Sequence, residues 1–207
     1  MKKWIACLIV LTVAVISASA MAGSAPVKKA AYPYLLDNFE DGTYTKDPEW
    51  FVFDNIMPSI TKEYSLRLSG SANDWYVGGI GTVLGVDVSG YDTFEIDVYG
   101  YGETSGKLKI ELYDDDNGNA DIEVDKSWKP LYDDLWSYET DVNWTGMRHL
   151  SIPLKEFKNM GRGNNVFDPN LKNGSGGLVK IQIICVAASQ TGSVNYNIDN
   201  LEFGVKK

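Results

Sequence analysis

Acidic residues stand inside short apolar segments at both ends of the chain. The opening segment contains Asp37, Glu40 and Asp41, and the closing segment contains Asp199 and Glu202. A carboxylate within an apolar strand either faces solvent or needs a partner, because burying it unpaired is costly. If the two segments lie side by side in one sheet, their oxygens could share a hard cation such as calcium. Surface acids and a shared calcium ion both remain open from the residues alone.

The densest acidic stretch is Asp114-Asp115-Asp116-Asn117-Gly118-Asn119. It invites comparison with the calcium loops that have glycine at position six. That register places Tyr113 at position one and Val124 at position twelve, and neither residue supplies a carboxylate. The stretch is therefore predicted to be a solvated turn between strands. A local calcium site and polar contacts to a sugar are the alternatives.

The residue groups that enzymes use are sparse. His149 is the single histidine, and it lies in a predicted strand. No serine has a nucleophile-elbow motif and no histidine–cysteine cluster has zinc spacing. The glycine-rich stretch 78–81 lacks the lysine and helix of a phosphate loop. A carboxylate pair could hydrolyse a glycoside, but abundant acids make such pairs common. The sequence predicts no enzyme, with a small glycoside hydrolase as an alternative.

Aromatic residues flanked by Asp, Asn, Ser and Gly suit sugar binding instead. Planar side chains stack on the apolar face of a pyranose ring, while nearby acids and amides bind its hydroxyl groups. Trp50 and Trp144 are predicted to be structural. The candidates for exposed rings are Trp75, Tyr99, Tyr113, Trp128 and Trp136, one or two of them at a time.

Alternating strands must position these side chains. In residues 93–99 Phe94, Ile96 and Val98 alternate with polar residues, and residues 107–113 repeat the pattern. The outward residues are predicted to share one sheet and form a polar-aromatic cleft; they are Asp97, Tyr99, Lys109, Glu111, Tyr113, His149, Lys180 and Gln182. The predicted carbohydrate-binding residues are Trp75, Asp97, Tyr99, Glu111, Tyr113, Trp128, Trp136, His149 and Gln182.

The overall pattern predicts an all-β protein. About eight to ten strands separated by turns indicate an antiparallel β-sandwich, and only residues 154–160 suggest a short helix. Residues 34–204 form the predicted domain and 23–33 a linker. Residues 1–22 read as a secretory signal peptide, with Lys2 and Lys3 before an apolar run and small residues at the cleavage sites.

The net charge limits the possible partners, and the cysteine content limits the possible thiol chemistry. The 28 acidic residues outnumber the 19 basic ones, for a net charge of −9, which disfavours nucleic acid. The apolar run of the signal is too short to span a bilayer, so a secreted or periplasmic location is expected. Past the signal, Cys185 is the one cysteine, and a buried, inert thiol is predicted.

Three motifs together resemble a known family. They are Leu36-Asp37-Asn38-Phe39-Glu40-Asp41-Gly42, the strand Leu150-Ser151-Ile152-Pro153-Leu154 with Glu156-Phe157, and Asn197-Ile198-Asp199-Asn200-Leu201-Glu202-Phe203. They look like the galactose-binding-like β-jelly-roll, and in particular like carbohydrate-binding modules of family 11 and relatives. The resemblance implies two curved sheets, a sugar cleft on the concave face and a structural calcium near the termini. By position, Glu40 and Asp199 are the best calcium ligands, followed by Asp37 and Asp41.

The sequence therefore predicts an exported, non-catalytic protein that binds a poly- or oligosaccharide. Such modules usually adjoin a catalytic domain, which this chain lacks. A structural or interaction protein of the cell envelope, with a protein partner, is the main alternative on the same fold.

Overall fold

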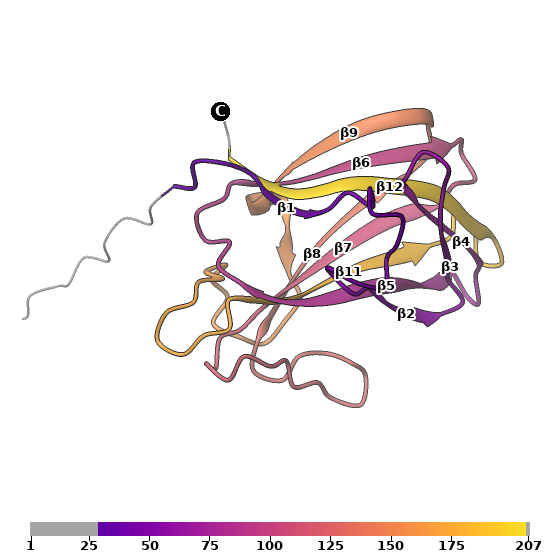
Figure 1. The fold of residues 1–207 in the computed structure, drawn as a ribbon. Helices are drawn as coiled ribbons and strands as arrows, with labels where there is room; N and C mark the ends of the chain where they lie inside the picture. Colours follow the sequence, from indigo (N-terminus) through magenta and orange to yellow (C-terminus); the bar gives the residue numbers. More distant parts are fainter. Residues whose placement is uncertain (1–28, 206–207) are drawn as a thin grey trace, which may run out of the picture.

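Two antiparallel sheets pack face to face in the computed structural model, which describes residues 29–205 (Figure 1). Sheet 1 has the strand order β3-β4-β12-β6-β9, with β1 also paired to β12. Its strands are β1 (Tyr34–Asp37), β3 (Met57–Ile60), β4 (Leu66–Ser71), β6 (Thr93–Tyr101), β9 (Thr145–Pro153) and β12 (Ser193–Gly204). The predicted all-β sandwich is confirmed.

Sheet 2 has the order β10-β8-β7-β11-β5-β2. Its strands are β2 (Phe51–Asp54), β5 (Tyr76–Val86), β7 (Lys107–Asp114), β8 (Asp134–Asp141), β10 (Lys158–Asn159) and β11 (Leu178–Val186). A 3-10 turn, η1 (Leu154–Glu156), occupies only the start of the expected helix. The rest of that segment includes β10, which pairs with β8.

The core lies between the sheets and follows the predicted alternation. Phe94, Ile96 and Val98 of β6 are fully buried, and so are the inward residues of β7. In β11 a register shift between Leu178 and Lys180 interrupts the alternation, so that Leu178 joins the core. This is the effect of a β-bulge, which changes which residues face inward.

The opening and closing strands are neighbours, as predicted. β1 pairs antiparallel with β12, and Tyr34 lies opposite Phe203; the two strands run side by side in Figure 1. Before β1, the Ala30 amide donates a hydrogen bond to the Gly90 carbonyl. The predicted signal peptide lies outside the described residues. Within residues 29–205, no helix has the length and apolar character needed to cross a membrane.

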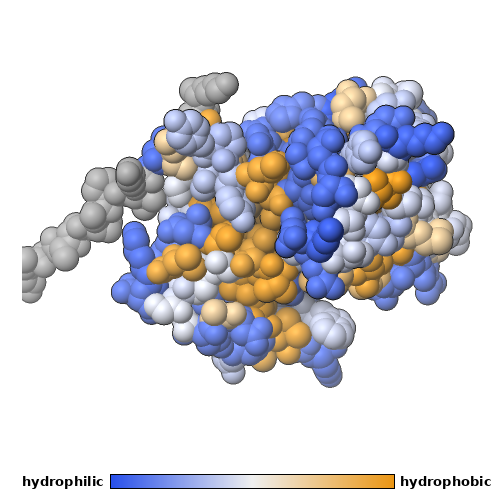
Figure 2. Space-filling model, viewed as in Figure 1, coloured by the Kyte–Doolittle hydropathy of each residue, from blue (hydrophilic) through white to orange (hydrophobic). Residues whose placement is uncertain are grey.

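Cys185 is fully buried and free, as expected. The Tyr196 hydroxyl donates a hydrogen bond to its sulfur at 3.1 Å, and burial raises the pKa of the thiol to about 12. Not all apolar residues are buried: in the space-filling view a band of hydrophobic residues crosses the molecule between hydrophilic ones (Figure 2).

Candidate functional site

The outer face of sheet 2 combines polar and aromatic residues. Residues paired across neighbouring strands point to the same face of a sheet. Glu111 pairs with Gln182, Gln182 with Gly81, and Gly81 with Phe51, so these four residues form one row. We call this surface the Glu111 face; it comprises Phe51, Phe53, Gly79, Gly81, Lys109, Glu111, Tyr113, Lys180 and Gln182.

Two phenylalanine rings lie against the glycines of β5 on this face. A Cβ atom added to Gly81 would be 2.4 Å from Cζ of Phe51, and one added to Gly79 would be 2.7 Å from Cζ of Phe53. The ring centroids of Phe51 and Phe53 are 6.1 Å apart. Phe51 remains 38% exposed. Only glycine leaves room for rings in this position, so the glycines of β5 create an exposed aromatic platform.

Beside the platform, polar groups form a hydrogen-bonded network. The Tyr113 hydroxyl lies 3.0 Å from Oε2 of Glu111 and 2.9 Å from Oε1 of Gln182. Lys109 donates from Nζ to Oε1 of Glu111 at 2.6 Å. Glu111 is buried beneath these groups. The single hydroxyl proton of Tyr113 is shared between Glu111 and Gln182, and this contact places the Gln182 side chain beside Glu111 at the surface.

Burial of Tyr113 beside Glu111 favours the protonated hydroxyl. Burial, followed by the charge of Glu111, raises the pKa of Tyr113 well above its ordinary value. Lys180 Nζ lies 3.9 Å from the centroid of the Tyr113 ring, in the geometry of a cation–π contact. Burial also lowers the pKa of Lys180.

A further aromatic residue borders this face. Tyr76, at the start of β5, is 40% exposed. Its hydroxyl donates to Oδ2 of Asp54 at 2.6 Å. Phe51, Phe53 and Tyr76 were not among the residues expected to bind sugar. The stretch Gly78-Gly79-Ile80-Gly81 within a strand was the available signal, since glycine in a strand marks a close approach.

The structure corrects the expectation that one sheet holds all the outward residues. Glu111, Tyr113 and Gln182 do meet on sheet 2, but Asp97, Tyr99 and His149 lie on sheet 1. The reason is the connectivity: β6 and β7 follow each other in sequence but belong to opposite sheets. Alternation indicates which side chains face outward, and it does not indicate which sheet contains the strand.

On sheet 1, His149 lies between two carboxylates. Its Nδ1 is 2.8 Å from Oδ1 of Asp97, and its Nε2 is 3.0 Å from Oε2 of Glu95. The hydrogen bond to Asp97, together with the charges of both acids, raises the pKa of His149. Both ring nitrogens are thus engaged, which favours a cationic imidazolium over a free base. We call this surface the His149 face; it comprises Glu95, Asp97, Tyr99, His149, Ser151 and Glu202.

A pocket of about 720 Å³ opens beside the His149 face. Its lining includes Glu95, His149, Ser151 and Tyr91. The Ser151 hydroxyl donates to Oε1 of Glu95 at 2.8 Å. Ser151 therefore contacts a carboxylate and not the imidazole, so the group is an ion-pair cluster and not a nucleophile–base pair.

The tryptophans divide into structural and exposed ones. Trp50 and Trp144 are buried, as predicted, while Trp75 and Trp128 are 45% and 81% exposed. Trp75 precedes β5, and Trp128 lies in the loop between β7 and β8, so the two are at opposite ends of sheet 2. Trp136 pairs with Leu112 and packs against the core. It therefore does not share the Glu111 face.

The first of the predicted calcium ligands already has protein partners. Asp37 lies in β1, opposite Leu201 of β12. One oxygen of Asp37 accepts the Phe39 amide at 2.8 Å, and the other accepts the indole N–H of Trp50 at 2.7 Å. Burial raises the pKa of Asp37.

The other predicted ligands are more open. Glu40 and Asp41 are exposed. Burial raises the pKa of Asp199 to about 6, and neighbouring carboxylates contribute to the shift. These carboxylates are those of Asp97, Glu40 and Asp37. In the part of the chain that the structure describes, the quartet does not bring three ligand atoms together within 4.8 Å. Calcium at the termini stays a prediction.

The acidic stretch after β7 differs from the expected solvated turn. Asp114 and Asp115 are 1% and 4% exposed, whereas Asn117, Gly118 and Asn119 are exposed. The buried part arises because a second loop, residues 160–177, covers the end of β7; the amide of Gly176, for example, donates to Asp115 at 2.6 Å. Sequence reasoning could not anticipate this contact between segments about 60 residues apart.

Solved structures of the same fold are known. The family 11 carbohydrate-binding module of the cellulosomal cellulase Lic26A-Cel5E of Clostridium thermocellum aligns with a TM-score of 0.55 and 15% identity, covering 86% of this chain and 97% of that one. A family 11 module from Clostridium thermocellum in complex with a β-1,3-1,4-mixed-linked tetrasaccharide aligns with a TM-score of 0.53 and 17% identity, covering 86% and 98%.

The fold also occurs within a larger protein. The agarase AgWH50C aligns with a TM-score of 0.53 and 12% identity, over 84% of this chain but only 25% of the agarase chain. No protein-family model and no curated protein matches the sequence. At these identities the likeness establishes the fold, and the resemblance to the family 11 β-jelly-roll is confirmed at that level.

Proposed function

We propose that this protein binds a poly- or oligosaccharide, without catalysis, on the Glu111 face. The observation on which the proposal rests is the aromatic platform: Phe51 and Phe53 lie over glycines, next to an ordered polar network. A pyranose ring offers an apolar face to such rings and hydroxyl groups to such a network. The shared fold with modules that bind carbohydrate supports the same assignment.

The chemistry of binding divides between these two parts. Phe51 and Phe53 would stack on sugar rings, and Gln182 and Lys109 would bind the hydroxyl groups. Their polar atoms are already oriented by Glu111 and Tyr113, so little side-chain entropy is lost on binding. An open sheet face buries only part of a ligand, and we therefore expect weak affinity.

Affinity electrophoresis and titration calorimetry test the proposal directly. The panel should include β-1,3-1,4-mixed-linked glucan, other β-glucans, mannans and peptidoglycan fragments. We expect retardation by at least one polysaccharide and no release of chromophore from a set of chromogenic glycosides. If no glycan retards the protein, and a pull-down recovers one partner protein stoichiometrically, the protein would instead be an interaction protein of the envelope.

Two further properties belong to this proposal. The basic start and apolar run of residues 1–22 support export to the periplasm or the medium. The burial of Asp199 beside the carboxylates of Asp97, Glu40 and Asp37 supports a structural calcium near the termini. Mass spectrometry of the mature N-terminus tests export. To test the calcium ion, the melting temperature is measured with and without calcium. We expect calcium to raise it in the wild type and the rise to be lost in Asp199→Asn.

A further inference from the structure

Two long loops meet at one end of the sandwich. Residues 115–133 connect β7 to β8, and residues 160–177 precede β11. Asp115 joins them, since its side chain accepts the amides of Gly118, Ala120 and Gly176. Both oxygens of the Asp115 carboxylate therefore accept backbone N–H groups.

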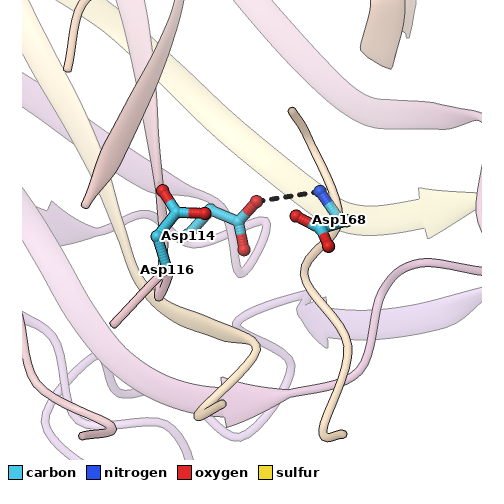
Figure 3. A group of neighbouring side chains, drawn as sticks. All are labelled: Asp114, Asp116 and Asp168. Atoms are coloured by element: carbon cyan, nitrogen blue, oxygen red, sulfur yellow. Dashed lines mark hydrogen bonds between the residues drawn. The ribbon is translucent and has the colours of Figure 1, made fainter. Parts of the chain in front are cut away.

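Three other carboxylates at this junction face one another. Asp114 ends β7, Asp116 lies in the first loop and Asp168 in the second. One oxygen from each lies within 4.8 Å of the other two. In Figure 3 the carboxylate of Asp114 lies between those of Asp116 and Asp168, and the Asp168 amide donates to Asp114 at 2.9 Å. The group thus links a strand end to both loops.

Several buried oxygens in this group have no hydrogen-bond partner. Asp114 is 1% exposed; its Oδ2 accepts the Asp168 amide, but its Oδ1 has no donor. Asp116 accepts the Asn164 amide through Oδ2, and its Oδ1 is likewise unpartnered. Asp134, which is fully buried and paired with Asp114 in the sheet, has an unpartnered Oδ2. Leaving charged acceptors buried without donors costs free energy.

Basic side chains do not neutralise this group. None of the ion pairs formed by residues 29–205 involves Asp114, Asp116 or Asp168, and the nearby Arg162 pairs with Asp125. The side chains are therefore arranged as they would be around a positive charge that the protein itself does not supply.

We propose that Asp114, Asp116 and Asp168 bind one hard divalent cation, Ca²⁺, which fastens the end of β7 to the two loops. The ligands are all oxygens, which Ca²⁺ prefers and zinc does not. A cavity of about 210 Å³, whose lining includes Asp116, Asp168, Asn164 and Lys172, has room for water ligands. Within the described residues, Lys172 makes no ion pair with the three acids. Irregular loop ligands also suit Ca²⁺ better than Mg²⁺, which demands near-octahedral geometry.

This site is independent of sugar binding and of the predicted calcium at the termini. It differs from an EF-hand, because its ligands come from segments about 50 residues apart. Its structural role would be to order the loop that presents Trp128. A cation site of this kind couples metal binding to loop folding.

Terbium luminescence offers a local readout on the full-length mature protein. The ring centroids of Trp136 and Phe167 are 5.5 Å apart, and Phe167 immediately precedes Asp168 in the sequence. Excitation of Trp136 should sensitise Tb³⁺ bound in place of Ca²⁺, and Ca²⁺ should displace it. Trp136→Phe should reduce the signal without changing the calorimetric affinity for Ca²⁺.

Asparagine substitutions decide between this site and the alternatives. Asp116→Asn and Asp168→Asn should each weaken Ca²⁺ binding at least about tenfold, since each removes a charged ligand. With a chelator present, the melting temperature of Asp116→Asn should be no lower than that of the wild type, because the substitution removes one of three mutually repelling carboxylates. The control Asp121→Asn makes the same charge change on an exposed residue of the same loop and should bind as the wild type.

Each outcome separates the possibilities. Ca²⁺ binding that both substitutions preserve but Asp199→Asn abolishes would place the ion at the termini and overturn this site. A wild type with neither a calorimetric response nor a rise in melting temperature on adding Ca²⁺ would also overturn it, leaving a cluster of protonated acids. Loss of Ca²⁺ binding with unchanged glycan affinity would confirm the site while leaving the sugar proposal intact.

Discussion

The two outer faces of the sandwich contain similar residue types and organise them differently. On the Glu111 face, the acid is buried, is held by Lys109 and Tyr113, and lies beside rings seated on glycine. On the His149 face, the acids contact a half-exposed imidazole, and the neighbouring rings of Tyr99 and Tyr101 pack edge to face, with their centroids 5.0 Å apart. Similar composition therefore gives a preorganised polar–aromatic surface on one sheet and an ion-pair cluster on the other. The difference lies in the glycines of β5.

The strongest test removes the platform. In the double variant Phe51→Ala/Phe53→Ala we expect glycan affinity to fall by about thirtyfold, because each stacked ring contributes on the order of 1 kcal/mol. Titration calorimetry with the best-bound polysaccharide measures the change. The matched variant Tyr99→Ala removes a ring from the other sheet and should retain wild-type affinity. Equal losses of glycan affinity in the two variants would show that the two faces do not differ in sugar binding.

The next test breaks the polar network. Glu111→Gln keeps the shape of the side chain but removes the charge that Lys109 and Tyr113 contact. We expect unfolding to become easier by roughly 1–3 kcal/mol, the usual effect of losing a buried, charge-assisted hydrogen bond. Glycan affinity should fall about tenfold as Gln182 loses its fixed orientation. Denaturant melts and calorimetry give the two quantities.

A control for that test lies on the same sheet. Glu139→Gln removes an exposed carboxylate that pairs with Lys107 at 3.1 Å. Exposed ion pairs contribute little, so stability should change by less than about 1 kcal/mol, with no loss of affinity. If Glu139→Gln behaved like Glu111→Gln, net charge and not the network would explain the result.

A subtler change displaces one ring without deleting it. In Gly81→Ala the new Cβ would lie 2.4 Å from Phe51 Cζ and 2.9 Å from Gln182 Cγ, so the ring must move. We expect affinity to fall severalfold. In the double variant Gly81→Ala/Phe51→Ala the glycine substitution should add little, since the two changes act through one contact. Fully additive losses would argue against a platform formed by that contact.

The sequence was sufficient for the faces of individual strands and for the meeting of the chain ends. Alternation in residues 93–99 and 107–113 correctly separates inward from outward side chains. It could not assign strands to sheets, which is why Asp97 and Glu111 were expected together. Nor could it identify Phe51 as an exposed ring, because that depends on Gly81, a residue about 30 positions away that pairs with it.

The acidic junction illustrates the same limit. The calcium-loop pattern fails at its two ends, Tyr113 and Val124, and local reasoning accordingly predicts a solvated turn. The third carboxylate, Asp168, arrives from another loop and donates its own amide to Asp114. Sites assembled from distant segments leave no fixed spacing in the sequence, so only the tertiary structure brings such residues together.

The smallest expected effect concerns the His149 face. The groups facing the imidazole are Asp97 and Glu95 of β6, and their hydrogen bonds and charges raise the pKa of His149 above 6.5. A raised pKa in the folded state stabilises the fold fully below about pH 6.5, and this contribution disappears as the pH rises through the raised value. Because the side chain is 58% exposed, solvent screens the effect.

An NMR titration of the single histidine measures this directly. Asp97→Asn should lower the pKa of His149 toward its ordinary value, since it removes the largest stabilising contact. Glycan affinity should stay constant across the same pH range, because the histidine lies on the opposite sheet from the proposed sugar site. An affinity that follows the His149 titration curve would move the binding site to sheet 1 and reverse the roles of the two faces.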